Sequence, residues 1–286
     1  MRRQIIFAAF ASSLLAAGAC APQDEAATDS SGGDGGGSCS PADLQTLEAD
    51  TLTIATDEPA YAPWMVDDEP TSGEGFESAV AYAVAEQLGY SQDQVTWTRV
   101  PFNVAIQPGD KPFDFDINQF SISEERQQAV DFSSPYYTVA QALVAIEGNP
   151  AADAGSLADL QDLRLGAQVA TTSLQILTDV IAPTTEPSVF NSNDDAKLAL
   201  QNGQIDGLVV DLPTAYFISN VELDGGVLVG QLPGGEGGDE FGLLLAKDSP
   251  LTDCVSQAVD ALREDGTLDE LEQEWLSDVI DAPVLE

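Results

Sequence analysis

The chain has 286 residues, 43% of them hydrophobic, so it can bury a sizeable core in one large domain or in two lobes. With 49 acidic against 9 basic side chains it repels nucleic-acid phosphates, and we expect no nucleic-acid partner. It contains no histidine, which excludes Ser-His and Cys-His catalysis and histidine-ligated metals, and we expect no metal and no cofactor. The acidity has two open explanations, a well-solvated surface or adaptation to high salt.

Residues 1–19 are predicted to be a signal peptide for export. Two arginines precede an apolar run at 5–17 that is too short for a stable membrane anchor. The small residues before Cys20 resemble a lipobox, in which the cysteine is acylated and becomes the mature N-terminus. We favour lipidation, but residues 17–19 read Ala-Gly-Ala, which also satisfies the rule for ordinary secretion. We therefore expect either a lipoprotein on the outer face of the cytoplasmic membrane or a periplasmic protein.

Residues 20–40 are predicted to form a flexible, lipid-anchored tether. Between 21 and 38 no apolar side chain is larger than alanine, so this stretch cannot bury a core. Lipidation of Cys20 would leave Cys39 and Cys254 as the other two cysteines. An exported, oxidising setting favours a disulfide between them, and this bond would close a long loop of the chain.

The folded part is expected to start with a strand at 51–56, which ends at Asp57. Tyr61 and Trp64 follow in a loop that contains proline. Aromatic side chains directly after a strand can either line a ligand site or cap the core. The next expected elements are a helix at 76–88, with apolar residues at helical spacing, and a strand at 95–100 that leads to Phe102.

The stretch from 113 to 137 carries the most information about function. An alternating apolar and acidic strand at 113–117 runs into a polar loop, and Arg126 follows among acids. The motif Asp-Phe-Ser-Ser-Pro-Tyr-Tyr closes the stretch at 131–137. Backbone amides, hydroxyls and one planar guanidinium together suit a small carboxylate. The polar loop residues of interest are Asn118, Gln119 and Ser121.

Strands and helices alternate through the second half of the chain as well, which predicts α/β lobes with largely parallel sheets. Thr171 and Thr172 open a predicted helix after a strand at 165–167, and a helix N-terminus is a natural anion site. A strand at 205–211 ends in Asp211, which could also cap the next helix. The remaining expected elements are strands at 141–146 and 241–246, a helix at 194–202, and amphipathic helices between 251 and 275.

These motifs resemble the solute-binding proteins of ABC importers, in the polar amino-acid branch (family 3) of the bilobal binding-protein superfamily. The strand, serine-rich loop, arginine and Asp-Phe-Ser-x-Pro-Tyr-Tyr motif match that family, and the likeness continues along nearly the whole chain after residue 50. The resemblance implies two Rossmann-like lobes with mainly parallel sheets, joined by a two-strand hinge. Lobe 1 would comprise 41–140 and 241–286, and lobe 2 would comprise 141–240.

The resemblance also implies a role for each candidate site residue. Arg126 and Ser121 would hold the carboxylate of the ligand from lobe 1, and amides at Thr172 would join from lobe 2. Asp211 would accept the ammonium group of the ligand. Pocket walls and floor would come from Asp57, Tyr61, Trp64, Phe102, Asn118, Gln119 and Thr171.

Several of these assignments have structural alternatives. Tyr61 and Trp64 could cap the core, Arg126 could pair with a neighbouring acid, and Thr171 could serve only as a helix cap. The resemblance implies a monomeric protein that captures a polar amino acid or similar zwitterion and delivers it to the permease of an ABC importer, without being an enzyme. Two other functions stay open: a cyclohexadienyl-type dehydratase on the same fold, which needs a buried acid, and a ligand-sensing module.

Overall fold

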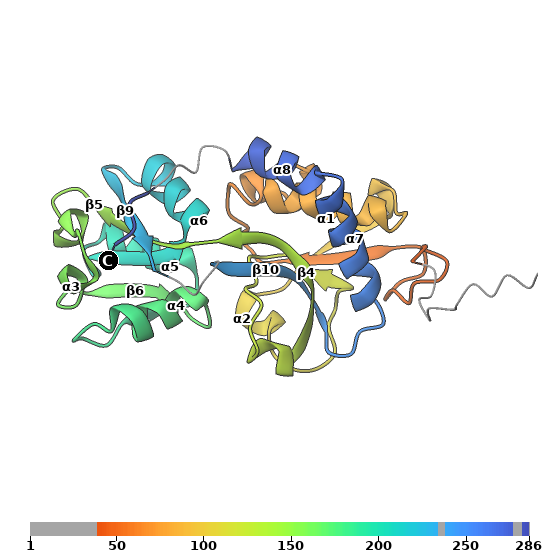
Figure 1. The fold of residues 1–286 in the computed structure, drawn as a ribbon, viewed down its shortest axis with the longest axis horizontal. Coiled ribbons are helices and arrows are strands. Elements are labelled where there is room, and N and C mark those ends of the chain that lie inside the picture. Colours follow the sequence, from red (N-terminus) through yellow and green to blue (C-terminus); the bar gives the residue numbers. More distant parts are fainter. Residues whose placement is uncertain (1–38, 234–237, 277–281, 286) are drawn as a thin grey trace, which may run out of the picture. The chain divides into compact units, whose positions relative to one another are not determined.

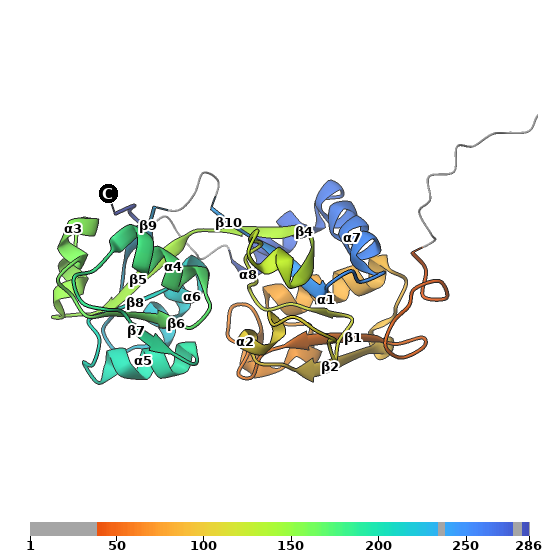
Figure 2. The same cartoon turned by 90° about the horizontal axis from the view of Figure 1, so that it is seen from below.

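The computed structural model describes residues 39–233, 238–276 and 282–285 (Figure 1). This part of the chain contains two five-stranded sheets, each with helices on both faces (Figures 1 and 2). Strand order is β2-β1-β3-β10-β4 in the first sheet and β7-β6-β8-β5-β9 in the second. The predicted α/β class is confirmed. The predicted signal peptide, the lipidation site Cys20 and nearly all of the predicted tether lie outside the described residues.

The first sheet combines parallel and antiparallel pairs. β1 pairs in parallel with β2 and β3, whereas β10 pairs antiparallel with β3 and β4. Its strands are β1 (Leu52–Thr56), β2 (Val95–Arg99), β3 (Phe115–Asp116), β4 (Val130–Val139) and β10 (Asp239–Ala246). One face packs against α1 (Phe76–Gln87), α7 (Thr252–Glu264) and α8 (Thr267–Trp275), and the other carries α2 (Phe102–Ala105).

The second sheet is built in the same way. β6 pairs in parallel with β7 and β8, and β5 pairs antiparallel with β8 and β9. Its strands are β5 (Gln141–Ile146), β6 (Leu165–Gln168), β7 (Ser188–Phe190), β8 (Gly207–Asp211) and β9 (Gly226–Leu232). The helices are α3 (Leu157–Leu160) and α4 (Thr172–Ile176) on one face, and α5 (Asn193–Gln201) and α6 (Leu212–Phe217) on the other.

Two chain segments cross from one sheet to the other. β4 leads through Ala140 into β5, and β9 is followed by β10. Antiparallel pairing holds the crossings together, since Asp239 is opposite Val139 and Gln141 is opposite Leu232. These strands account for the antiparallel part of each sheet, which the strand–helix alternation in the sequence did not reveal.

The last described residues lie on the second sheet, although the sequence assigned all of 241–286 to the first lobe. The Gln231 N–H donates to the Pro283 carbonyl at 2.8 Å, and the Leu285 N–H donates to the Gln231 carbonyl at 2.9 Å. Leu285 is only 2% exposed and packs with the core of the second lobe. β9 is an edge strand whose free backbone groups can receive such a segment, and a four-residue stretch carries no periodicity that predicts it.

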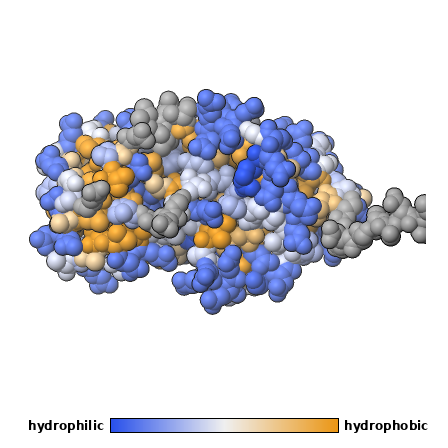
Figure 3. Space-filling view, viewed as in Figure 1, coloured by the Kyte–Doolittle hydropathy of each residue, from blue (hydrophilic) through white to orange (hydrophobic). Residues whose placement is uncertain are grey.

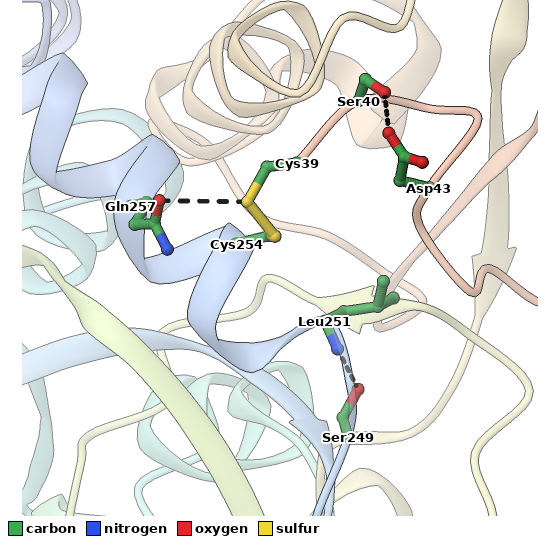
Figure 4. Close-up of a disulfide and its surroundings, with 7 residues drawn as sticks. All are labelled: Cys39, Ser40, Asp43, Ser249, Leu251, Cys254 and Gln257. Atoms are coloured by element: carbon green, nitrogen blue, oxygen red, sulfur yellow. Dashed lines mark hydrogen bonds between the residues drawn. A yellow bond between two sulfur atoms is a disulfide. The ribbon is translucent and has the colours of Figure 1, made fainter. Parts of the chain in front are cut away.

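The expected disulfide between Cys39 and Cys254 is present (Figure 4). The two Cα atoms are 5.4 Å apart, which is usual for a disulfide. Cys254 lies in the first turns of α7, with Gln257 one turn further along. The bond therefore fixes the start of the described chain to the first lobe.

The surface differs between the lobes on the face seen in Figure 3. Hydrophilic residues dominate over the helices of the first lobe, whereas hydrophobic residues gather over part of the second lobe. Among the described residues, no helix combines the length and the apolar character that a membrane crossing requires.

Candidate functional site

A pocket lies between the two lobes, where β1, β6 and β8 end, and its empty space is about 480 Å³ with the solvent at its mouth included. Open α/β sheets commonly bind ligands beyond the carboxyl ends of their strands. Ten of the eleven candidate residues line it: Asp57, Tyr61, Phe102, Asn118, Gln119, Ser121, Arg126, Thr171, Thr172 and Asp211. Both lobes contribute, because the first seven precede the crossing at Ala140 and the last three follow it.

Arg126 forms one end of the pocket. Its guanidinium donates to the Ser121 carbonyl at 2.7 Å and, across the lobes, to the Ala170 carbonyl at 2.8 Å. It also lies 5.5 Å from the centre of the Phe102 ring. No ion pair of Arg126 occurs among the described residues, and the nearby Asp131 pairs with Lys247 instead, at 2.9 Å. The guanidinium is therefore held by neutral groups, while the charges of Asp211, Asp239 and Glu125 act on it from a greater distance.

Asp211 provides negative charge at the pocket. It ends β8, and its Oδ1 accepts a hydrogen bond from the Gln141 side-chain amide at 2.5 Å. Burial, together with the charges of Asp239 and Glu77, raises the pKa of Asp211 to about 7, although the Gln141 bond and the Arg126 charge act in the opposite direction. Asp211 occupies the N-cap position of α6 without a side-chain capping bond. The carboxylate is thus oriented by Gln141 and not by the helix.

The carboxylate of Glu77 accepts hydrogen bonds from the polar loop of the first lobe. The Gln119 backbone N–H donates to Glu77 Oε1 at 2.7 Å, and the Gln119 side chain and the Tyr136 hydroxyl donate to the same carboxylate. Burial raises the pKa of Glu77 to about 7. Gln119 has a left-handed backbone, with φ of 47°, which these bonds stabilise. Asn118 is 7% exposed and also lines the pocket.

The start of α4 brings the second lobe against the first. The Thr171 hydroxyl accepts a hydrogen bond from the Leu174 N–H at 3.1 Å, so Thr171 caps α4. It also lines the pocket, so it is not only a helix cap. The Thr172 and Ser121 hydroxyls are 3.1 Å apart across the lobes. The two hydroxyls and Arg126 therefore converge at one end of the pocket.

Asp57 and Tyr61 line the first-lobe side. The carboxylate of Asp57 accepts the N–H groups of Glu58 at 2.7 Å and Phe102 at 3.1 Å. Burial raises the pKa of Asp57, and these bonds partly offset the effect. The Tyr61 hydroxyl lies against Ser192 and Asp194 at the start of α5, and burial raises the pKa of Tyr61.

Trp64 is the candidate that does not line the pocket. Its side chain has no exposed surface and packs edge-on against Tyr137 and Phe241, with ring centres 5.8 Å apart in both pairs. The indole N–H donates to the Thr214 hydroxyl of α6 at 2.8 Å. The large apolar ring is thus buried in the first-lobe core, as the alternative of core capping proposed, and its polar edge reaches the second lobe.

The sequence did not single out four further lining residues: Gln168, Ser173, Asn193 and Val210. Each is near the end of a strand or in the first turn of a helix. The rule that ligands bind at the carboxyl ends of strands could have pointed to Gln168 and Val210. Ser173 directly follows the predicted Thr172, whereas nothing local in the sequence indicates Asn193.

Asp116 is a buried acid outside the pocket lining. It has no exposed surface, and neither of its carboxylate oxygens has a hydrogen-bond partner among the described residues. Burial, together with the charges of Glu77 and Asp57, raises the pKa of Asp116 well above its usual range. In the part of the chain that the structure describes, no group of three or more acidic or cysteine side chains is placed to hold a metal ion.

Comparisons with known proteins agree with this architecture. A probable histidine-binding protein of Campylobacter jejuni is 27% identical over 228 residues, which cover 77% of this chain and 83% of that protein. The L-arginine-binding protein of Pseudomonas aeruginosa is 26% identical over 252 residues, covering 82% and 91%. The solved structure of an ancestral arginine-binding protein bound to arginine superposes with a TM-score of 0.64, at 28% identity, over 79% of this chain and 98% of that one.

Residues 52–278 match one protein family as a single continuous region. That region includes both sheets, both crossing segments and every residue that lines the pocket. The chain belongs to the bacterial extracellular solute-binding proteins, family 3.

Proposed function

We propose that this protein captures an amino acid with a cationic side chain between its two lobes and delivers it to the permease of an ABC importer. The observation that carries the proposal is the charge of the pocket. One guanidinium, Arg126, and two carboxylates, Asp57 and Asp211, line the same small space. A ligand with one carboxylate and two cationic groups would complement all three.

The contacts expected for the ligand follow from this placement. Its carboxylate would accept bonds from Arg126, Ser121 and Thr172, which converge at one end. Its α-ammonium would pair with Asp211. The side chain would then extend between Tyr61 and Phe102 toward Asp57. Charge-assisted bonds of this kind are about twice as strong as neutral ones, and a pocket closed to water strengthens them further.

Binding from both lobes explains why closure would accompany capture. Arg126 belongs to the first lobe and Asp211 to the second, so one ligand satisfies both only when the lobes are together. A ligand shifts an equilibrium between open and closed states by its difference in affinity for the two. The direct contact between the lobes at Ser121 and Thr172 supports a closed state as the binding state.

The cationic side chain is favoured by Asp57 and by some of the relatives. A neutral amino acid would add no positive charge beside Asp57, where Arg99 is a nearby cation, and burial already raises the pKa of this carboxyl. Several of the similar proteins are named for binding arginine or histidine, whereas others are named for binding glutamine or cystine. The main support for a basic ligand here is therefore the Asp57 carboxylate in the pocket.

Export and anchoring form part of the proposal. Homologues of this family act outside the cytoplasm. Lipidation of Cys20 would hold the protein at the outer face of the cytoplasmic membrane, next to its permease. We expect the protein to act as a monomer. Incorporation of labelled palmitate into the wild type and not into Cys20→Ala would support the anchor, and absence of label from both would contradict it.

A dehydratase is the second candidate, because burial raises the pKa of Glu77 and of Asp211 to about 7. A carboxyl group with such a pKa can act as a general acid near neutral pH. Incubation of the purified protein with a cyclohexadienyl acid separates the two functions. Turnover would favour the enzyme, and its absence together with stoichiometric amino-acid binding would favour the transporter component.

A thermal-shift screen of the twenty amino acids tests the proposal. A ligand that binds only the native state adds about 2.7 kcal/mol to the free energy of unfolding at a concentration of 100 times its Kd. It therefore raises the melting temperature. Arginine, lysine or histidine should give the largest shift, and calorimetry should then give one site per chain. A larger shift with acidic or apolar amino acids would contradict the predicted side-chain charge. No shift with any amino acid would contradict the function.

A further inference from the structure

Gln141 is a buried polar residue that the candidate site does not contain. It is the first residue of β5, directly after the chain crosses from the first sheet to the second. Its side chain is 2% exposed and lies outside the pocket lining. A buried amide must satisfy its donors and its acceptor inside the protein, so its partners indicate its role.

All the partners of the Gln141 side chain belong to the pocket or to the second crossing. The amide nitrogen donates to Asp211 Oδ1 at 2.5 Å and to Asp239 Oδ2 at 3.2 Å, with the Thr172 hydroxyl at 3.5 Å. The amide oxygen accepts the Ser173 hydroxyl at 2.6 Å. One neutral side chain thus joins a residue at the ammonium end of the pocket, the first turn of α4 and the first residue of β10.

The geometry fixes the direction of the Asp211 carboxylate. Gln141 and Asp211 are opposite each other in the antiparallel ladder of β5 and β8, so both move with the second sheet. The amide bonds to Oδ1, and no hydrogen bond to Oδ2 occurs among the described residues. Since a planar amide has two N–H groups at a fixed angle, bonding to both acids fixes the side from which Asp211 Oδ1 is bonded.

Asp239 gives the network its link to the first sheet. It begins β10, which pairs with β3 and β4, so the Gln141–Asp239 bond connects the two sheets directly. The same amide separates two carboxylates that repel each other. Neither Asp211 nor Asp239 has an ion pair among the described residues, and a cationic group arriving at Asp211 would relieve that repulsion.

We propose that Gln141 is a positioning residue, which holds Asp211 in the orientation that receives the α-ammonium of the ligand. The inference rests on the proposed function, because it assigns Asp211 to the ammonium. It predicts that loss of the Gln141 amide weakens only ligands that carry this ammonium. A residue that merely stabilised the crossing would weaken every ligand to the same degree.

The test uses Gln141→Met, which keeps the length of the side chain and removes its hydrogen bonds, with Gln141→Leu as a second variant. Three probes separate the groups of the ligand: L-arginine, agmatine, which lacks the carboxylate, and 5-guanidinopentanoate, which lacks the α-ammonium. Calorimetry or competitive displacement gives each Kd. A hydrogen bond to a charged group corresponds to about a 10- to 100-fold effect. L-arginine and agmatine should lose that factor in both variants, and 5-guanidinopentanoate should change less than about threefold.

Gln231→Met is the matched control. Gln231 is a glutamine on β9, the neighbouring strand, and its amide donates to the Ala282 carbonyl at 3.0 Å, away from the pocket. This control should leave all three affinities unchanged. If the Gln141 variants weaken all three probes in parallel, or none, the positioning role is overturned while the proposed function stands. If the wild type binds neither L-arginine nor any other amino acid with a cationic side chain, both are overturned.

Discussion

Two acids with raised pKa, one fully buried in the first lobe and one partly buried in the second, differ in what surrounds them. Asp116 in β3 has no hydrogen bond to either carboxylate oxygen among the described residues and lies outside the pocket lining. Asp211 at the end of β8 accepts a hydrogen bond from Gln141 and lines the pocket. Burial raises the pKa of both. The cost of burying the carboxylate is thus uncompensated at Asp116. At Asp211 the carboxylate has a hydrogen bond and lines the pocket, where a ligand can pair with it.

A similar difference is expected between the pocket wall and the interior of the first lobe. Arg126, like Asp211, is held by neutral partners and faces the pocket. We therefore expect substitutions in the pocket wall to change binding with little effect on stability. Substitutions in the interior of the first lobe should change stability with little effect on binding.

The largest expected effect on binding comes from Arg126→Ala. Removing the guanidinium leaves the ligand carboxylate unpaired in a closed pocket, which costs about 2–5 kcal/mol of binding free energy. Calorimetry with L-arginine measures it. Arg164→Ala is the control, because Arg164 pairs with Asp206 on the second lobe and does not line the pocket. A loss below about 0.5 kcal/mol at Arg126, the size of an ordinary surface change, would remove it from the site.

The next effect concerns the disulfide between Cys39 and Cys254, which is partly buried against the core of the first lobe. Reducing it should lower the free energy of unfolding by about 2–4 kcal/mol, since it closes a long loop of the unfolded chain. Urea denaturation with and without reductant gives the difference. The affinity for L-arginine should stay within about twofold at low urea. A large loss of affinity with unchanged stability would contradict the expectation that the disulfide affects stability and not ligand binding.

Asp116→Leu should stabilise the protein by about 1–3 kcal/mol near neutral pH, because it removes a buried polar group without partners. For an acid whose pKa is raised by folding, the folded state binds more protons than the unfolded state, so stability falls as pH rises above the unfolded pKa. The gain from Asp116→Leu should therefore grow with pH and be smallest near pH 3, where the carboxyl is protonated in both states.

Asp114 provides the matched control for this prediction. Its two carboxylate oxygens accept the N–H groups of Leu47 at 2.8 Å and Thr53 at 2.7 Å. Asp114→Leu should therefore destabilise the protein, although Asp114 is only two residues away from Asp116. Denaturation of both variants between pH 3 and 8 decides the matter. Two effects of the same sign would contradict the comparison of paired with unpaired acids.

The smallest expected effect is the pH dependence of binding. Asp211 must be ionised to pair with the α-ammonium, and burial raises its pKa to about 7 without ligand. The affinity for L-arginine should therefore fall as pH decreases below about 7, by up to about tenfold per pH unit. The affinity for 5-guanidinopentanoate, which lacks the ammonium, should vary much less. Equal pH profiles for the two ligands between pH 5 and 8 would contradict the assignment of Asp211 to the ammonium group of the ligand.

The alternation of strands and helices in the sequence indicated the α/β class. Asp57 and Asp211 follow or end strands, and that position predicts a place at the carboxyl edge of a sheet. The role of Arg126 and most of the other pocket residues came from the family resemblance that the motifs carry. The disulfide followed from the number of cysteines and the expected compartment.

The features that could not be predicted depend on which segments meet in space. Trp64 stands in a loop beside the site, yet its ring fills the core of the first lobe. The role of Gln141 requires β5 to pair with β8, and that of Glu77 requires the polar loop to lie over α1. Residues 282–285 are bound by the free edge of β9, which no pattern in those four residues indicates.

The most direct test of the central claim is a crystal structure of the protein grown with L-arginine. The ligand should lie between the lobes, with its carboxylate within about 3 Å of the Arg126 guanidinium and its α-ammonium within about 3 Å of Asp211, as charge-assisted hydrogen bonds require. A ligand bound elsewhere, or bound between the lobes with Arg126 and Asp211 turned away from it, would contradict the account.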